Sequence, residues 1–432
     1  MTKLGAYWKR LQESLWFVPG LCTVGALLLS FATVEVDRGY LRGWDLPGWV
    51  FLAGAEGVQG MLTAIAGSLI TVTGVVFSVT IVALQLASSQ FTPRVLRNFT
   101  ADRANQVVLG VFIGTFTYAM MVLRVVRLPV GGGDAFVPAL SAIVAGLLAL
   151  ISIGFLIFFI DHLARAIQAE VILELVADQT EKVAERIFPR EPETDEGLEP
   201  SPPPAQPGSV PSSRAGYLQA IDEERLLEIA AEHGLTLRVE LLVGEFLLVG
   251  SPVVAVWPAV AVQDGLSHEI RQGLVIGTER TPHQDVGRGI LEISDLAVKA
   301  LSPGINDPTT ALVCVDRLAQ VLLAIGRGHE RPGWRRAEDE EARLFLPRPS
   351  FEDALRQGFG PIAFYGAEHP RVLRRLLEQL ARLAALLPPT RRPALLRQVE
   401  VVEERARAHL ERADGLESVQ AAVAAARAAC AA

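Results

Sequence analysis

Cysteine is scarce in this chain, and the few cysteines present form no pattern. Only Cys22, Cys314 and Cys430 occur among the 432 residues. Three scattered thiols make neither a disulfide framework nor a Cys-x-x-Cys pair of metal ligands. We therefore expect no bound metal, and we expect the water-soluble part of the chain to occupy a reducing compartment.

Catalytic signatures are also missing. The sequence has no P-loop, no Gly-x-Gly-x-x-Gly, no Gly-x-Ser-x-Gly and no His-Glu-x-x-His motif. His283 and Asp285 stand close together beside Arg280, but a metal site requires more ligands than these. The sequence therefore predicts neither an enzyme nor a protein that holds a cofactor.

Positive charge is too dispersed for a nucleic-acid-binding protein. The chain has 40 Lys and Arg against 48 Asp and Glu, a formal net charge of -8, and the two signs are interspersed. Phosphate backbones are bound by a concentrated positive face. Nucleic acid is therefore excluded as an expected partner.

Long apolar runs, by contrast, fill the first third of the chain. Each of the four is long enough to cross about 30 Å of hydrocarbon as a helix: Leu15–Val34, Met61–Ala87, Val107–Leu123 and Pro138–Ile160. No Asp, Glu or Lys lies deep in any of them, which argues against a proton-coupled pump. The sequence predicts a four-helix transmembrane domain over residues 1–165, with the lipid bilayer as its first partner.

The first run also resembles the start of a secretory signal, because basic residues precede it. It is longer than a usual signal core, however, and Trp16 and Trp44 flank it as interfacial anchors would. We interpret it as a retained span. Lys and Arg are slightly more numerous before the first run and between the second and third runs than in the other flanks, which predicts cytoplasmic termini.

The rest of the chain reads as water-soluble and changes pattern several times. Residues 166–188 have the periodicity of an amphipathic helix, and the proline-rich residues 189–213 bury too little apolar surface to fold, which predicts a disordered linker. Short Val- and Leu-rich runs bounded by glycine predict a small β unit over 214–265. Helical stripes predict a bundle over 266–432. The fold class is thus an α-helical membrane domain plus an α+β cytosolic domain.

A polar stripe runs along the second apolar segment. Its members fall within about 100° on a helical wheel: Thr71, Gly74, Ser78, Gln85, Ser88 and Ser89. Hydroxyl and amide groups in hydrocarbon need partners, so the stripe either lines a water-filled pathway or forms a packing seam within a subunit or an oligomer. Gln85 is the residue that packing explains least.

The same helix continues into a membrane-exit elbow formed by Gln90, Pro93, Arg94 and Arg97. Proline breaks or kinks a helix, and arginine meets anionic lipid headgroups. The elbow is therefore either a hinge that couples the soluble part to the membrane or a simple helix-to-helix connection.

A second candidate site lies in the soluble part. Ser302 and Asn306 stand between two predicted helices, and Asp307 caps the second of them. This geometry leaves free backbone amides beside Thr309 and Thr310, which we expect to be able to bind an anion. Together with Arg280 and Asp285 these residues make a possible ligand site, although capping alone explains most of their types.

These motifs resemble those of a family of predicted bacterial membrane proteins, domain of unknown function 2254. The resemblance rests on Val76–Gln85 continuing into Ser89–Arg94, on Gly216–Asp222, on Arg280 and Asp285, and on Ala300–Pro308. It covers about residues 10–410 and implies a multi-pass protein of the bacterial inner membrane with a cytosolic domain. It implies no established activity.

Two hypotheses follow. In the first, copies of the chain form a homo-oligomer with a pathway for ions or small solutes along the polar stripe, and the cytosolic domain senses a stimulus. In the second, the spans only anchor a cytosolic binding or scaffold module.

Overall fold

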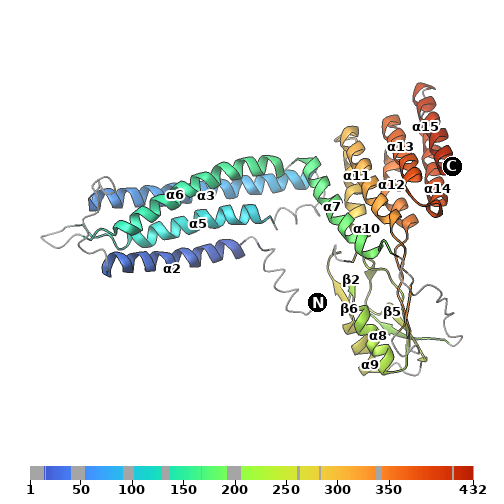
Figure 1. Cartoon of the computed structure of the whole chain (residues 1–432), viewed down its shortest axis with the longest axis horizontal. Helices are drawn as coiled ribbons and strands as arrows, with labels where there is room; N and C mark the ends of the chain where they lie inside the picture. Colours follow the sequence, from blue (N-terminus) through green and yellow to red (C-terminus); the bar gives the residue numbers. More distant parts are fainter. Residues whose placement is uncertain are drawn as a thin grey trace. The chain divides into compact units, whose positions relative to one another are not determined.

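The computed structural model describes most of the chain and divides it into two compact units, Met1–Val171 and Ile172–Ala432 (Figure 1). The residues that it describes are 14, 16–39, 54–90, 102–128, 136–166, 168–191, 206–259, 263–281, 284–331, 333–336, 343–410 and 413–431.

The first unit consists of long apolar helices. They are α2 (Phe17–Gly39), α3 (Ala55–Gln90), α5 (Arg103–Leu123) and α6 (Ala139–Ala166). Each contains one of the predicted apolar runs, and a helix satisfies its own backbone where no water is present. By length and composition five helices of the described residues are able to cross a membrane, because Pro308–Arg327 of the second unit also qualifies. The number of spans therefore stays a prediction.

Helix α5 is the centre of the first unit and packs against α2, α3 and α6. Phe112 and Tyr118 on α5 are fully buried. Gly110 and Gly114 let α2 approach closely, since a Cβ built on Gly110 would lie 2.8 Å from Cys22 Sγ. The buried faces of the other helices all point toward α5.

A polar cluster ties one end of these helices together. The buried carboxylate of Asp37, near the end of α2, accepts hydrogen bonds from Leu140 N at 2.9 Å, Ser141 N at 3.0 Å and Ser141 Oγ at 2.6 Å. These amides belong to the first turn of α6, so α2 caps α6. Tyr118 Oη lies 2.8 Å from Thr33 Oγ1 and donates to Ser141 O, which adds α5 to the cluster.

The second unit combines a helical bundle with a small β unit. Its helices are α7 (Ala169–Ile187), α8 (Glu223–Glu232), α9 (Asp264–Gln272), α10 (Val286–Ala300), α11 (Pro308–Arg327), α12 (Phe351–Tyr365), α13 (Pro370–Leu386), η2 (Pro389–Arg391), α14 (Arg392–His409) and α15 (Ala413–Ala431). Helix α7, predicted as an amphipathic helix over 166–188, packs on the bundle, where Thr180 lies against Gly289 of α10. Aliphatic stripes such as Leu373, Leu376 and Leu380 of α13 are fully buried.

Eight strands form the β unit in two sheets. They are β1 (Gly208–Pro211), β2 (Gly216–Ile221), β3 (Thr236–Val239), β4 (Phe246–Leu247), β5 (Pro252–Trp257), β6 (Leu274–Gly277), β7 (Trp334–Arg336) and β8 (Arg343–Phe345). One sheet has the order β1-β5-β3-β8-β7 and the other β4-β2-β6. Only the β3–β8 pair is parallel.

The structure corrects two of the predicted boundaries. The linker predicted over 189–213 ends too late, because β1 occupies Gly208–Pro211, pairs with β5 and buries Val210 in the core of the β unit. The region 266–432, predicted as helical, also supplies β6, β7 and β8 to the sheets. Strands this short pair with segments far away in the chain, so their local pattern carries little signal.

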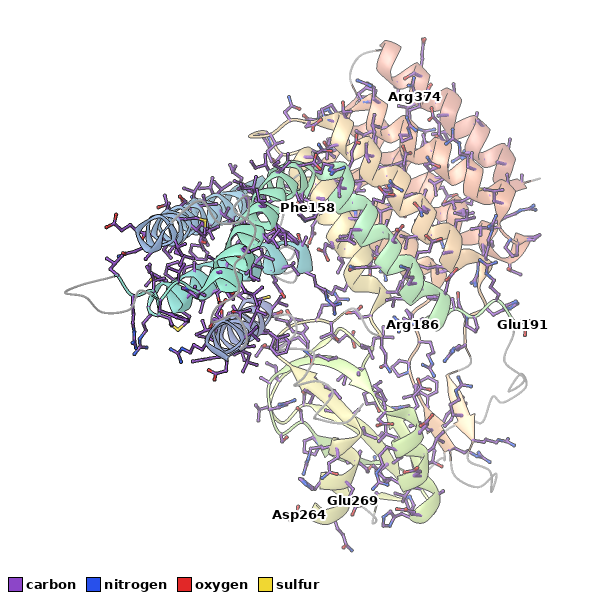
Figure 2. The ribbon with its side chains drawn as sticks, turned by 60° about the vertical axis from the view of Figure 1, so that its left-hand side comes forward. Phe158, Arg186, Glu191, Asp264, Glu269 and Arg374 are labelled. Atoms are coloured by element: carbon purple, nitrogen blue, oxygen red, sulfur yellow. The ribbon has the colours of Figure 1, made fainter. Side chains whose placement is uncertain are left out.

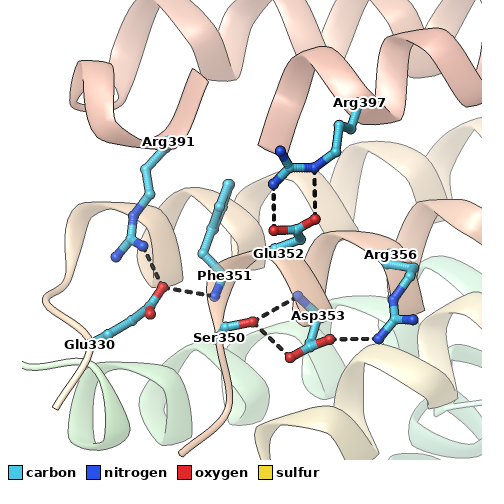
Figure 3. A network of polar contacts seen from close by, with 8 residues as sticks. All are labelled: Glu330, Ser350, Phe351, Glu352, Asp353, Arg356, Arg391 and Arg397. Atoms are coloured by element: carbon cyan, nitrogen blue, oxygen red, sulfur yellow. Dashed lines mark hydrogen bonds and ion pairs between the residues drawn. The ribbon is translucent and has the colours of Figure 1, made fainter. Parts of the chain in front are cut away.

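The β unit lies at one end of the helical bundle, and the segments that cross between them are anchored by ion pairs. Figure 2 shows Arg374 of α13 far from Asp264 and Glu269 of α9. At the crossing end, the Glu330 carboxylate accepts from Phe351 N, the first residue of α12, and from Arg391 (Figure 3).

Arg391 gathers several groups at this end of the bundle. It donates to Gly328 O at 3.0 Å, and its guanidinium lies 5.4 Å from the centre of the Phe351 ring. A Cβ on Gly328 would collide with the backbone of Phe188, so the end of α7 packs tightly here as well. One arginine thus connects the ends of α7 and α11 with the starts of α12 and α14.

Glu223 makes the matching connection inside the β unit. Its carboxylate, at the start of α8, receives both terminal nitrogens of Arg348 at 2.9 Å, and Arg335 Nε lies 3.9 Å away. Burial alone would raise the pKa of Glu223, but the hydrogen bonds and charge of Arg348, with the charges of Arg335 and Arg331, outweigh it and lower the pKa. The ion pair therefore favours the folded state when Glu223 is ionised.

We predict that Glu223→Gln destabilises the second unit by about 2 kcal/mol at neutral pH, since a charge-assisted bidentate contact is lost. A folded-state pKa below the ordinary value gives stabilisation that is present above the ordinary pKa and lost as the pH falls through the lowered one. The difference between wild type and variant in thermal unfolding should therefore shrink in acid.

The matched control is Glu228→Gln, which removes an exposed pair with Arg225 one helical turn further along α8. Such an exposed pair contributes little to stability. Equal effects of the two substitutions at neutral pH would contradict the prediction.

Candidate functional site

The polar stripe of α3 lies on the outside of the first unit. Thr71, Gly74, Ser78 and Gln85 are all exposed. The backbone of α3 extends through Ser88, Ser89 and Gln90, whose side chains lie outside the described part of the structure. The stripe is therefore a surface feature of a single chain.

The buried face of α3 points the opposite way. Residues on this face contact α5 and α6: Val58, Leu62, Leu69, Val76 and Ala83. With 100° of rotation per residue, the centre of the stripe lies roughly 180° around the helix from this face. A packing seam within the subunit, one of the predicted alternatives, is therefore wrong for the described helices.

The exposed face of α3 is longer and more regular than the polar stripe predicted from the sequence. Continuing the stripe toward the start of α3 gives exposed positions spaced alternately by four and three residues: Gly60, Ala64, Gly67, Thr71, Gly74, Ser78, Ile81 and Gln85. This is the spacing of a left-handed helix–helix seam. Counting hydroxyls and amides missed Gly60 and Gly67, and a search for the 4-3 spacing of small residues would have found them.

The three glycines of this face have no packing reason among the residues that the structure describes. A Cβ built on Gly60, Gly67 or Gly74 meets nothing within 4 Å. Glycine in a helix interior costs about 1 kcal/mol relative to alanine. Packing against the described helices therefore does not explain the small residues of this face.

Polar groups of this face differ in how they are satisfied. The Thr71 hydroxyl donates a hydrogen bond to Gly67 O at 2.9 Å. It would therefore stay satisfied if this face were in contact with lipid. Gln85, in contrast, has no hydrogen-bond partner among the described residues. Its amide still needs a hydrogen-bond partner, because hydrocarbon offers none.

The membrane-exit elbow lies mostly outside the described residues, which exclude Pro93, Arg94 and Arg97. The structure resumes at Asp102, whose carboxylate caps α5 by accepting from Ala104 N at 2.9 Å. Its other oxygen lies 2.6 Å from His162 Nε2 of α6, and His162 stacks on Phe158. The start of α5 is thereby joined to the end of α6, while the hinge remains a prediction.

Arg280 and Asp285 form a compact ion pair in the second unit. Arg280 Nε and Nη2 donate to the buried Asp285 carboxylate at 2.6 and 2.7 Å, and Asp285 also accepts from Arg288 N as the cap of α10. A Cβ on Gly244 would lie 2.8 Å from Arg280 Nη2 and still closer to Asp285 Oδ2. The Asp285 carboxylate already accepts hydrogen bonds from Arg280 and from Arg288 N. The Arg280–Asp285 pair is therefore a closely packed junction between the β unit and α10.

The loop before α11 is capped from within. Asp307 accepts from Thr309 N at 3.0 Å, from Thr310 N at 3.2 Å and from Thr310 Oγ1 at 2.5 Å. The hydrogen bond from the Thr310 side chain is the largest of the interactions that lower the pKa of Asp307. The amides that were expected to bind an anion are occupied by this carboxylate.

The two halves of the predicted ligand site do not meet. Arg280 and Asp285 lie at the start of α10, whereas Ser302, Asn306 and Asp307 follow its end. A helix of 15 residues separates them, and at 1.5 Å per residue it is about 22 Å long. They do not form one site. Among the described residues, no group of three or more His, Cys, Asp or Glu could hold a metal.

We predict that Gly244→Ala destabilises the second unit by more than the about 1–2 kcal/mol that positive φ costs a non-glycine residue. Gly244 has a φ of +99° and its missing side chain makes room for the Arg280–Asp285 pair. Gly250→Ala is the matched control, because its φ is +83° but nothing lies within 4 Å of a Cβ there. Equal losses in thermal unfolding would show that the close contact is unimportant.

Comparisons with known proteins agree with the membrane character of the chain. The sequence profile of a family described as predicted membrane protein (DUF2254) matches residues 12–382. Uncharacterized proteins of Mycobacterium tuberculosis and Mycobacterium bovis are 32% identical to the chain over 399 residues, which is 91% of this chain and 76% of each relative. No solved structure matches.

Proposed function

The chain belongs to the DUF2254 family of predicted membrane proteins, and we propose that its copies associate through α3 to form a pathway for ions or small solutes. One observation carries the proposal. The face of α3 that bears Gly60, Gly67, Gly74 and Gln85 is exposed on the single chain, although it is the most polar face of the helix.

Helix packing in lipid explains why such a face favours association. Small residues let two backbones approach closely, and the 4-3 spacing keeps the same face in contact along a left-handed crossing. Gln85 lies near the end of this face, where a ring of α3 helices would place its amide beside water or a neighbouring amide. A seam that also carries hydroxyls and an amide suits a hydrated axis between copies.

The proposal assigns four spans to the membrane and α11 to the aqueous phase. Helix α11 packs against α10, α12 and α13, and its Asp316 contacts Arg375 of α13. Charged residues along α13 would lie in hydrocarbon if this bundle entered the bilayer: Arg371, Arg374, Arg375, Glu378 and Arg382. An apolar helix inside a bundle with charged outer surfaces is a soluble core helix.

The proposal also places both termini in the cytoplasm, because Lys and Arg are more numerous before the first run and between the second and third runs than in the other flanks. The second unit then lies in the cytoplasm of a bacterial cell, where it senses a stimulus. Thiol labelling of intact cells at an exposed position of this unit, such as Leu248→Cys, should then require permeabilisation.

A second candidate function is a membrane-anchored binding module without a pathway. It is favoured by an apolar patch on the β unit, where Phe246, Leu248 and Val249 are 53, 65 and 67% exposed. Contiguous exposed apolar residues mark contact sites. This candidate predicts that changes on the α3 face leave the protein's cellular role intact.

We predict that Ser78→Cys forms a disulfide-linked dimer in native membranes treated with an oxidant, because Ser78 faces a copy of itself or a neighbour. Val79→Cys is the control, since Val79 is also exposed but lies 100° further around the helix from Ser78. Cys22→Ser provides the background, and Cys314 and Cys430 are buried. Crosslinking at both positions or at neither would contradict the proposed seam.

A flux measurement separates the two candidate functions. We predict that purified full-length protein in liposomes gives ion or solute flux under voltage or osmotic challenge, and that Gln85→Leu loses most of it while keeping the Ser78→Cys crosslink. No flux from wild-type protein that still crosslinks would leave association standing and would favour the anchored module.

A further inference from the structure

We propose that the end of the helical bundle opposite the β unit rests on the lipid surface and that Ile305, Phe364 and Tyr365 contact the headgroups. These side chains are 43, 53 and 58% exposed. This inference uses only the part of the preceding proposal in which α6 spans the membrane.

The three side chains lie at one end of the bundle. Gly366, directly after α12, is packed against Leu301 at the end of α10, since a Cβ on Gly366 would lie 3.4 Å from Leu301 Cδ1. Ser294 Oγ of α10 donates to Gly358 O of α12 at 3.0 Å, so these two helices run in the same direction. Their ends, with the loop 302–307, therefore share one level.

Helix α7 begins at the same level. Arg317 Nη2 of α11 lies 3.7 Å from Glu174 Oε2, and Gln320 Nε2 donates to Glu181 Oε2 at 2.9 Å further along both helices. The order of these contacts shows that α7 and α11 run in parallel. The start of α7 is thus level with the start of α11 and with the loop that carries Ile305.

The chain leaves the membrane directly before this level. Helix α6 has 28 residues and is about 42 Å long, whereas the hydrocarbon is about 30 Å thick. Its last turns, with Asp161 and Arg165, therefore pass through the headgroup region. Two residues separate the end of α6 at Ala166 from the start of α7 at Ala169, which keeps this end of the bundle near the headgroups.

The chemistry of the end suits a lipid surface. Phe364 and Tyr365 are neighbouring aromatic rings, with centroids 5.1 Å apart, and the Arg405 guanidinium lies 4.9 Å from the centre of the Phe364 ring. Aromatic side chains favour the membrane interface, and arginine attracts anionic headgroups. Leu175, on the second turn of α7, is also 44% exposed.

The test places a fluorophore on full-length protein in vesicles of phosphatidylcholine with a minority of phosphatidylglycerol. Tyr365→Cys and Ile305→Cys, each in the Cys22→Ser background, are labelled with an environment-sensitive dye, and a fraction of the lipid carries a spin label on its headgroup. Leu248→Cys on the β unit is the matched control, because its side chain is at least as exposed.

We predict several-fold stronger quenching at residues 305 and 365 than at residue 248. Equal, weak quenching at all three positions overturns the proposal, as does strong quenching at residue 248 alone. Protection of residue 365 with crosslinking between copies would also overturn it, because the end would then be a protein interface. None of these outcomes depends on the Ser78→Cys crosslink or on flux, so failure here is distinguishable from failure of the proposed pathway.

Discussion

Hydrocarbon offers no hydrogen-bond partner, and this constraint governs where polar groups lie in the membrane unit. Asp37 is satisfied by the first amides of α6, and Tyr118 by Thr33 and Ser141. Within the described residues, Gln85 on the exposed face of α3 has no such arrangement. The same face carries glycines at which a Cβ would meet nothing among the described residues. The proposed oligomer with a hydrated axis would account for both facts, because small residues permit close helices and water would hydrogen-bond the amide.

The second unit is built so that its connections are rigid where segments cross. Arg391 fixes the start of α14 to the end of α11, and Arg348 fixes the β7–β8 region to the start of α8 through Glu223. Arg280 and Asp285 secure the start of α10 beside Gly244. These contacts hold together segments of the second unit that lie far apart in the sequence.

The periodicity of apolar residues made the helices predictable from the sequence. Strands and sites formed by residues far apart in the chain were not predictable in this way. The apolar runs of the first unit and the stripe of α13 lie where the pattern indicated, because one face of each helix buries its side chains. Strands β6 and β8 were missed because their partners β2 and β3 lie far away in the sequence, and β7 is only three residues long. The composite ligand site failed for a related reason: Asp285 and Asp307 are close in sequence, but a whole helix separates them. The orientation of the α3 stripe depends on which face α5 covers, and sequence alone does not give that.

The central claim is that the small and polar face of α3 points toward other copies of the chain. An experimental structure of the full-length protein in lipid nanodiscs tests it most directly. The account predicts a symmetric oligomer in which Gly67, Gly74 and Gln85 of each copy face the axis or a neighbouring α3. A monomer in which lipid acyl chains pack against Gly67 and Gly74 would contradict it.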